Sequence, residues 1–411
     1  MNARERILAG LDHREPDRVP LDLGATPSSG ISAVAFHNLD ARLGAGWGPP
    51  LVYDVVQQLA QPPDSFLDRF GVDVVDLGRA FDQAPGDWRD VELPGGIPAR
   101  FPSWFRFRER EDGTWDALDR DGDVLAVKPP GSAFFDQTYF PYLEGYPDHY
   151  RDLPAAMAKV MWAAFPTSPG HLAGEKDFWA RLREGAKALR ASTDRAILVG
   201  AGCNLFEWGT FLRRIDNFLM DLVDQPGRVE GLLDALMEVH LEGLGKLCEA
   251  VGDIADVVRF GDDLGMDSGP LMSPRTYRKL FKPRHAALCA FVKKHSRMRP
   301  FLHSCGSIYK LIPDLIEAGF EILNPVQIGA KDMDPAALKG EFGRDLTFWG
   351  GGCDTKSVLN RGTSLEVKDH VKKLLDTWMP GGGYVFNTVH NILPDVPPEN
   401  ILAMFEAVRE F

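Results

Sequence analysis

The chain has 411 residues, of which 44% are hydrophobic and 26% are charged, and its formal net charge is −13. This charge argues against a nucleic-acid-binding surface and against anionic lipid, because both are bound by clusters of Lys and Arg. No apolar run approaches the ~20 residues that span a bilayer, and the charged first turn lacks an apolar signal core. We therefore expect a cytoplasmic protein with neither nucleic-acid nor membrane partners.

Short apolar segments rich in β-branched residues recur along the chain, and longer amphipathic stretches lie between them. The strand candidates are Val19–Leu23, Val72–Leu77, Ala196–Ala201, Asp256–Phe260, Pro300–His303, Glu321–Val326, Leu346–Trp349 and Tyr384–Phe386. The helical stretches include Arg228–Ala250, Pro274–Lys294, Ser307–Ala318 and Ser364–Trp378. This alternation indicates a parallel sheet, and seven or eight such units favour a closed α/β fold, the (β/α)8 TIM barrel, over an open sheet.

One region in the N-terminal half departs from this alternation. From about Trp88 to Val127 apolar residues recur with period two, and Asp112-Gly113 and Asp121-Gly122 are typical of tight hairpin turns. The following segment, Pro129–Asp152, is rich in Pro, Tyr and Phe and predicts ordered irregular chain. We therefore predict one barrel domain over residues 1–411 with an antiparallel β insertion at about 88–152, which covers one barrel end or builds a subunit contact.

The clearest chemical signal is a His-x-Cys pair that directly follows a strand candidate. His303 and Cys305 are two residues apart, so on a strand their side chains share a face and can converge on one ion. Cys353 follows another strand through three glycines, which places it at the same C-terminal barrel face. Two thiolates and one imidazole suit zinc, and three protein ligands leave a fourth position open, as in catalytic sites. The alternative is a buried histidine beside inert core cysteines.

Other polar residues follow strand candidates at the same face. The candidate catalytic residues are Asp262, Asp263 and His390. The candidate substrate-binding residues are Asn204, Gln327 and Asn391. A carboxylate or imidazole there could act as acid or base, whereas the competing interpretation is a helix cap and a hydrogen-bonded loop histidine. The three remaining cysteines have no partner at metal-binding spacing, and we assign them to packing.

Longer motifs resemble the uroporphyrinogen decarboxylase superfamily. They are HSCGS at His303–Ser307, ILNPVQ at Ile322–Gln327, MDPAALKGEFG at Met333–Gly343, FWGGGCDT at Phe348–Thr355, PGGGYVFNTVHNI at Pro380–Ile392 and DVPPENILAMFEAVREF at Asp395–Phe411. The opening ERILAGLDHREPDRVPLDLG, Glu5–Gly24, fits the same superfamily. The resemblance covers most of the chain and independently implies the (β/α)8 barrel.

Within the superfamily, the His-x-Cys…Cys set is similar to the zinc methyltransferases that exchange methyl groups with corrinoid proteins. This resemblance implies that His303, Cys305 and Cys353 hold Zn²⁺. It also implies methyl transfer between a small methoxylated or thiol substrate and a corrinoid (cobalamin) on a partner protein, which in one direction is O-demethylation.

Two departures from the superfamily pattern limit this prediction. A glutamate that serves as fourth ligand in cobalamin-independent methionine synthase falls on Gln327, so water, substrate or Glu321 is expected to take its place. The arginine-rich motif of porphyrinogen decarboxylases is absent from Asp22–Ser32, which argues against porphyrinogen decarboxylation.

Two other functions stay open. The barrel could be a metal-free decarboxylase or lyase that acts through Asp262, Asp263 or His390. It could also be a non-catalytic corrinoid-handling protein with a structural zinc. The sequence does not identify the methyl donor, the acceptor, the direction of transfer or the oligomeric state, although a homodimer fits the superfamily.

Overall fold

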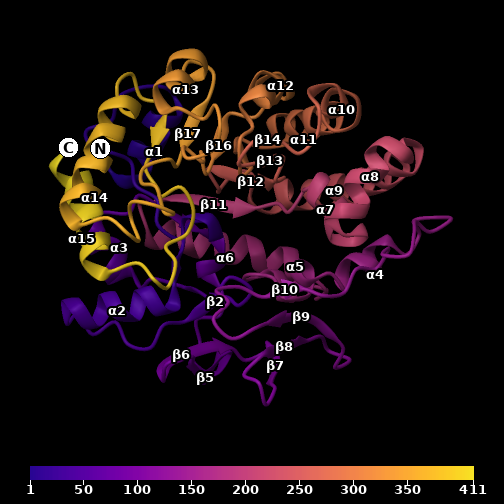
Figure 1. Cartoon of the computed structure of the whole chain (residues 1–411), viewed down its shortest axis with the longest axis horizontal. Coiled ribbons are helices and arrows are strands. Elements are labelled where there is room, and N and C mark those ends of the chain that lie inside the picture. Colours follow the sequence, from indigo (N-terminus) through magenta and orange to yellow (C-terminus); the bar gives the residue numbers. More distant parts are fainter.

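The computed structural model describes all residues from Met1 to Phe411 and shows the predicted barrel (Figure 1). Seven parallel strands form one sheet in the order β18-β17-β16-β15-β12-β11-β4. Their bounds are β4 Val74–Asp76, β11 Ala196–Gly200, β12 Val257–Gly261, β15 Arg299–His303, β16 Ile322–Asn324, β17 Thr347–Trp349 and β18 Tyr384–Val385. Each lies within, or within a residue of, a strand predicted from the sequence.

The eighth position of the barrel is filled by the segment around Leu21. Leu21 forms a parallel bridge with Phe386, and the backbone N–H of Asp22 donates to the Phe386 carbonyl at 2.9 Å. On the other side, the N–H of Asp73 donates to the Leu21 carbonyl at 2.8 Å. These bonds join the two edges of the seven-stranded sheet. The predicted strand Val19–Leu23 is therefore present as a bridge that closes the (β/α)8 barrel.

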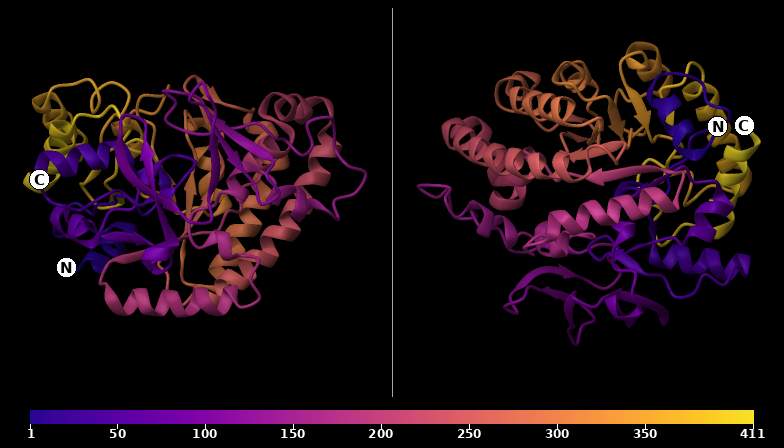
Figure 2. Two further views of the ribbon diagram at one scale, coloured as in Figure 1. Left: turned by 90° about the horizontal axis from the view of Figure 1, so that it is seen from below. Right: turned by 180° about the vertical axis from the view of Figure 1, so that it is seen from behind.

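Helices cover the outside of the sheet, and both chain termini lie close together on one side (Figures 1 and 2). The long helices are α6 Phe178–Ser192, α9 Pro226–Val251, α11 Lys282–His295, α14 Ser364–Trp378 and α15 Pro398–Glu410. The shorter ones are α1 Ala3–Leu11, α2 Ala33–Leu43, α3 Asp64–Phe70, α4 Leu153–Ala158, α5 Met161–Ala164, α7 Phe206–Arg213, α8 Ile215–Asp224, α10 Pro274–Leu280, α12 Ile312–Ala318 and α13 Pro335–Phe342. None of them combines the length and apolar character that a membrane crossing needs.

Two of the predicted helical stretches are shorter or divided in the structure. Pro274–Lys294 is split into α10 and α11, because Pro283 at the start of α11 has no N–H to continue the bonding pattern of the preceding turn. Ser307–Ala318 becomes a 3₁₀ turn at Tyr309–Leu311 followed by α12. The predicted bounds of α14 are observed unchanged.

Residues 88–137 form antiparallel strands, as the period-two pattern predicts. They are β5 Trp88–Leu93, β6 Ile97–Pro102, β7 Arg106–Glu109, β8 Trp115–Leu118, β9 Val124–Lys128 and β10 Asp136–Gln137. Gly113 and Gly122 have φ of 79° and 92°, the left-handed conformation that the predicted hairpin turns require. The hairpins pack on a small sheet of β1 Ile31–Ser32, β3 Leu59–Ala60 and β2 Val52–Asp54, far from α10–α13 in Figure 1.

Side chains of the barrel strands alternate between its inside and the helix-covered outside. One buried apolar cluster fills the inside and contains Val74, Leu198, Val257, Phe301, Ile322, Trp349 and Val385. In four of these strands, the next side chain that points inward, two residues after the apolar one, is polar. These positions are Asp76, Arg259, His303 and Asn324. The barrel interior thus has an apolar core and a layer of polar residues at its C-terminal end. In (β/α)8-barrel enzymes, active sites lie at this end.

Candidate metal centre

His303, Cys305 and His390 lie together at the C-terminal end of the barrel. One ligand atom from each lies within 4.8 Å of the others. The Cys305 Sγ is 3.5 Å from His303 Nε2, and the two imidazole centroids are 6.0 Å apart. His303 ends β15 and His390 follows β18, so the closure of the barrel brings them together. These three side chains offer a donor set that zinc accepts.

The orientation of His303 is fixed by a chain of buried hydrogen bonds. The Asn324 amide donates through Nδ2 to the Trp349 carbonyl at 2.8 Å, which turns its Oδ1 toward His303 Nδ1 at 2.7 Å. Because Oδ1 is an acceptor, Nδ1 carries the proton and Nε2 presents its lone pair toward Cys305. Ser28 Oγ donates to the same Oδ1 at 2.8 Å. An imidazole held in this way is preorganised as a metal ligand.

Asp263 lies beside this pair. Its Oδ1 accepts from the Cys305 backbone N–H at 2.9 Å and is 3.6 Å from His303 Nε2. Burial lowers the pKa of His303 to about 4, against the opposing effect of Asp263. Burial and then the negative Asp263 raise the pKa of the Cys305 thiol well above its usual range. The pair therefore holds a neutral imidazole, and its thiol becomes a thiolate only when a cation compensates the charge.

Cys353 is not part of this group. Its side chain is fully buried in the cluster between the strands and the outer helices, and its Sγ lies 3.9 Å from the Asp354 carbonyl. The glycines before it allow close packing, since a Cβ on Gly350 would lie 2.1 Å from the Pro325 carbonyl oxygen. The Cys353 carbonyl accepts from the Val389 N–H at 3.0 Å, so its backbone does run beside the loop that carries His390. Its role as a ligand stays a prediction.

Asp262 is placed differently from Asp263. It is fully buried, and its carboxylate accepts from the backbone N–H groups of Leu205 and Glu207 at 2.9–3.0 Å. His285 Nε2 lies 2.9 Å from its Oδ2. These contacts cap the start of α7 and tie it to α11. Asp262 therefore positions the turn at 204–207, and its direct catalytic role stays a prediction.

The three candidate substrate-binding amides all have protein partners. Gln327 Oε1 accepts from the Gly306 N–H at 3.0 Å, which supports the loop that carries Cys305. Asn204 donates to Glu207 at 2.6 Å, and Asn391 donates to Gln57 at 3.0 Å while its own Oδ1 is buried without a partner. Their contact with substrate stays a prediction.

The expectation that Glu321 could supply a fourth ligand is wrong. Glu321 precedes β16, at the N-terminal end of the barrel, whereas Asn324 and the metal centre lie at the other end. Its carboxylate is paired with Lys293 at 2.9 Å and with Arg299 at 2.8 Å.

Three polar residues of this end were not predicted as site residues: Glu207, Arg259 and Asn324. Burial, and then the charges of Asp263 and Asp262, raise the pKa of Glu207 well above its usual range. The sequence did indicate Arg259 and Asn324 in one way: each is a polar residue in an otherwise apolar strand, at a position whose side chain points into the barrel.

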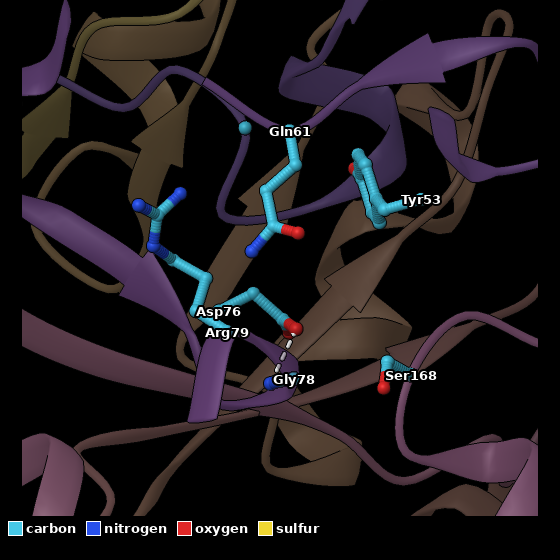
Figure 3. A pocket seen from close by; sticks show the side chains of 7 residues that line it. Tyr53, Gln61, Asp76, Gly78, Arg79 and Ser168 are labelled. Atoms are coloured by element: carbon cyan, nitrogen blue, oxygen red, sulfur yellow. Dashed lines mark hydrogen bonds between the residues drawn. The ribbon is translucent and has the colours of Figure 1, made fainter. Parts of the chain in front are cut away.

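A small polar cavity lies beside the end of β4 (Figure 3). Its lining includes Tyr53, Gln61, Asp76 and Ser168. Burial raises the pKa of Asp76 to about 7, although the Gly78 N–H and nearby arginines favour its charged form. The Tyr53 hydroxyl is buried and has no hydrogen-bond partner. The cavity thus contains donors and acceptors that the protein itself leaves unused.

The barrel and its polar C-terminal end define an α/β-barrel protein with a candidate metal centre. Residues 184–411 match the family uroporphyrinogen decarboxylase (URO-D), which is more than half of the chain. The chain therefore belongs to the URO-D family, in agreement with the motifs quoted above.

Comparison with known proteins shows similarity to two kinds of relative. A segment of 197 residues is 27% identical to the methylcobamide:CoM methyltransferase MtaA of Methanosarcina barkeri and covers 48% of this chain and 53% of that protein. A segment of 45 residues is 44% identical to uroporphyrinogen decarboxylase of Methylococcus capsulatus and covers 11% of this chain and 13% of that protein. A solved methyltransferase from Methanosarcina mazei shares the fold over 100% of this chain and 99% of its own, with a TM-score of 0.58 and 20% identity.

Proposed function

We propose that this protein is a zinc-dependent methyltransferase that moves a methyl group between a small methoxylated or thiol substrate and a corrinoid carried by a partner protein. The observation that supports this most directly is the 3.5 Å approach of Cys305 Sγ to a His303 Nε2 whose lone pair is free. The similarity to a methylcobamide:CoM methyltransferase supports the same class of reaction.

His303 and Cys305 would hold the zinc, with Cys353 as the third ligand that the family resemblance implies. When bound, zinc would stabilise the negative charge on the oxygen or sulfur that exchanges the methyl group. Asp263, close to both ligands and partly exposed, would take the proton from a thiol or return one to a leaving oxygen. Gln327 would keep the Cys305 loop in place through the Gly306 N–H.

The test begins with the metal content of the full-length protein purified without chelators. We expect about one zinc ion per protein chain. Less than about half an equivalent would contradict the proposal and favour the metal-free alternative. Methyl transfer is then measured with Co(I) cobalamin and a panel of methoxylated compounds and thiols, by the absorbance change of the corrinoid. Cys305→Ala should lose zinc and at least about 10³-fold in rate, whereas the control Cys248→Ala, in α9, should keep both.

The identity of the third ligand is decided by a second pair of variants. Cys353→Ala should lose zinc if the family resemblance holds, and His390→Ala should then keep it. The opposite result, full zinc in Cys353→Ala and loss in His390→Ala, would assign the third position to His390, which the observed geometry already brings within 4.8 Å of the other ligands.

A further inference from the structure

Arg259 is a cation in the barrel interior with no protein partner. It lies on β12 between Val257, which belongs to the interior cluster, and Gly261. Its Nε is buried without a hydrogen bond, and no carboxylate oxygen lies within the 4.0 Å that defines the ion pairs of this protein. A guanidinium is strongly destabilised in such a setting unless something compensates it. The unpaired Arg259 guanidinium therefore suggests that a ligand supplies its counter-charge.

The space beside Arg259 is open. Its register neighbour on β11 is Gly200, which also faces the interior and is exposed. A Cβ on Gly200 would meet no atom within 4 Å, and the same is true of Gly202. On the other side, β15 places His303 opposite Gly261, one inward position above Arg259. A small molecule in this space would touch the guanidinium at one end and reach the metal centre at the other.

A second unused donor faces the same region. The Tyr53 hydroxyl, on β2, is buried without a partner and feels the field of Arg259. The hairpins of residues 88–128 fix β2 in place, since Leu51 forms a bridge with Arg100 and Val52 packs in their cluster. Two buried donors without protein partners, close enough for the charge of Arg259 to act on the Tyr53 hydroxyl, suit an anion.

The surrounding acids restrict the charge of that anion. Glu207, Asp263 and Asp76 all lie close enough to act on Arg259. Burial raises the pKa of Glu207 well above its usual range and that of Asp76 to about 7, which favours the protonated form of each carboxyl. A dianion such as phosphate would be repelled by the remaining carboxylates, whereas a planar monoanion matches the fork of the guanidinium.

We propose that Arg259, assisted by Tyr53, binds the carboxylate of a small substrate whose methyl-bearing oxygen or sulfur lies at the His303–Cys305 centre. This inference rests on the proposed function and narrows its substrate to methoxylated or thiol-bearing carboxylic acids. Arg259 is a substrate-binding residue here and takes no part in bond making.

The test measures binding to the zinc-loaded, full-length protein by calorimetry, without corrinoid. The probes are methoxyacetate and 4-methoxybenzoate, each compared with its neutral amide, together with inorganic phosphate. Wild type should bind at least one carboxylate on the order of 10–100-fold more tightly than the matching amide. Arg259→Gln should remove this preference, Arg259→Lys should keep part of it, and the control Arg42→Gln, an exposed arginine of α2, should keep all of it. Tyr53→Phe should weaken carboxylate binding several-fold, which tests the site even if Arg259→Gln does not fold.

Three results would overturn the inference: no carboxylate preference in wild type, a preference that survives both Arg259→Gln and Tyr53→Phe, or tighter binding of phosphate. If an Arg259-dependent preference is found but no methyl transfer occurs, the proposed function fails and the anion site stands. If neutral substrates are turned over and Arg259→Gln leaves KM and kcat unchanged, the function stands and the inference fails. With the true substrate, Arg259→Gln should raise KM far more than it lowers kcat.

Discussion

Charged side chains inside the barrel have ion-pair partners at its N-terminal end and lack them at its C-terminal end. At the N-terminal end, a carboxylate stands directly before each of three strands and is held by two cations. These sets are Asp73 with Arg6 and Arg18, Asp256 with Arg4 and Arg190, and Glu321 with Arg299 and Lys293. At the C-terminal end, Arg259 has no carboxylate within ion-pair distance, and Asp22 and Asp76 have no cation.

This difference indicates that the two ends of one sheet have different roles, stability at one end and ligand binding at the other. A buried charge costs little when several partners surround it, and such a network ties neighbouring strands together. Charges and donors left without partners reduce stability, and they persist where a ligand completes them. The N-terminal end therefore holds the barrel closed, and the C-terminal end retains unsatisfied groups that the proposed metal and substrate would complete.

The largest effect is expected from breaking an N-terminal set. Asp73 is fully buried, and its two oxygens accept from Arg6 at 2.6 Å, from Arg18 at 2.8 and 2.9 Å and from the Leu21 N–H at 3.0 Å. Asp73→Asn would leave Arg18 without its ion-pair partner and Arg6 with Asp17 alone, and it should lower the free energy of unfolding by about 3–5 kcal/mol in urea. Its zinc content should not change.

The control for this prediction is Asp17→Asn, which removes a more exposed partner of Arg6. It should cost about 1 kcal/mol or less. An Asp73→Asn variant as stable as wild type would show that the N-terminal sets do not hold the barrel together.

A smaller, pH-dependent effect is expected at the opposite end, from Asp76. Burial raises its pKa to about 7 from a usual value near 4, so folding favours the protonated carboxyl. The stabilising contribution is complete below about pH 4 and is lost as the pH rises through about 7. Asp76→Asn cannot ionise, and relative to wild type it should gain about 2 kcal/mol in unfolding free energy between pH 5 and pH 8.

The control for this measurement concerns Asp22. Burial raises its pKa to about 6, and its charge acts on Asp76, so the same comparison in an Asp22→Asn background shows the contribution of Asp76 alone. A constant difference in stability across this pH range would show that Asp76 ionises normally in the folded protein.

The fold could be predicted from the sequence because its determinants are local. Near-continuous apolar strands alternate with amphipathic stretches, and even the weak Val19–Leu23 segment was identified by its composition. His303 and Cys305 were found for the same reason, since two residues on one strand must share a face. The β hairpins of residues 88–128 followed from period-two alternation and Asp-Gly turns.

The rest of the site depends on contacts between distant residues, which a local pattern does not contain. The approach of His390 to His303 follows from closure of the barrel, and the direction of the Cys353 side chain follows from glycines with unusual backbone angles. Asp262 and Asp263 are adjacent in sequence, yet one caps a helix and the other faces the metal centre. Arg259 was not predicted as a site residue, because the sequence of an apolar strand does not show that its guanidinium lacks an ion-pair partner.

The smallest effect, and the most specific one, is expected from Asn324, which acts on the metal centre through His303. Asn324→Ala removes the acceptor that holds the proton on His303 Nδ1 and frees the ring to rotate or change tautomer. Zinc affinity, measured by competition with a chelator, should fall by at least about tenfold, while His303 and Cys305 remain as ligands. Asn324→Asp keeps an acceptor at the same place and should recover part of the loss, whereas the control Asn38→Ala, on α2, should show none. If Asn324→Ala binds zinc as tightly as wild type, the buried hydrogen bonds around His303 serve packing alone, and the contrast between the two ends of the barrel would not extend to the residues that support the metal ligands.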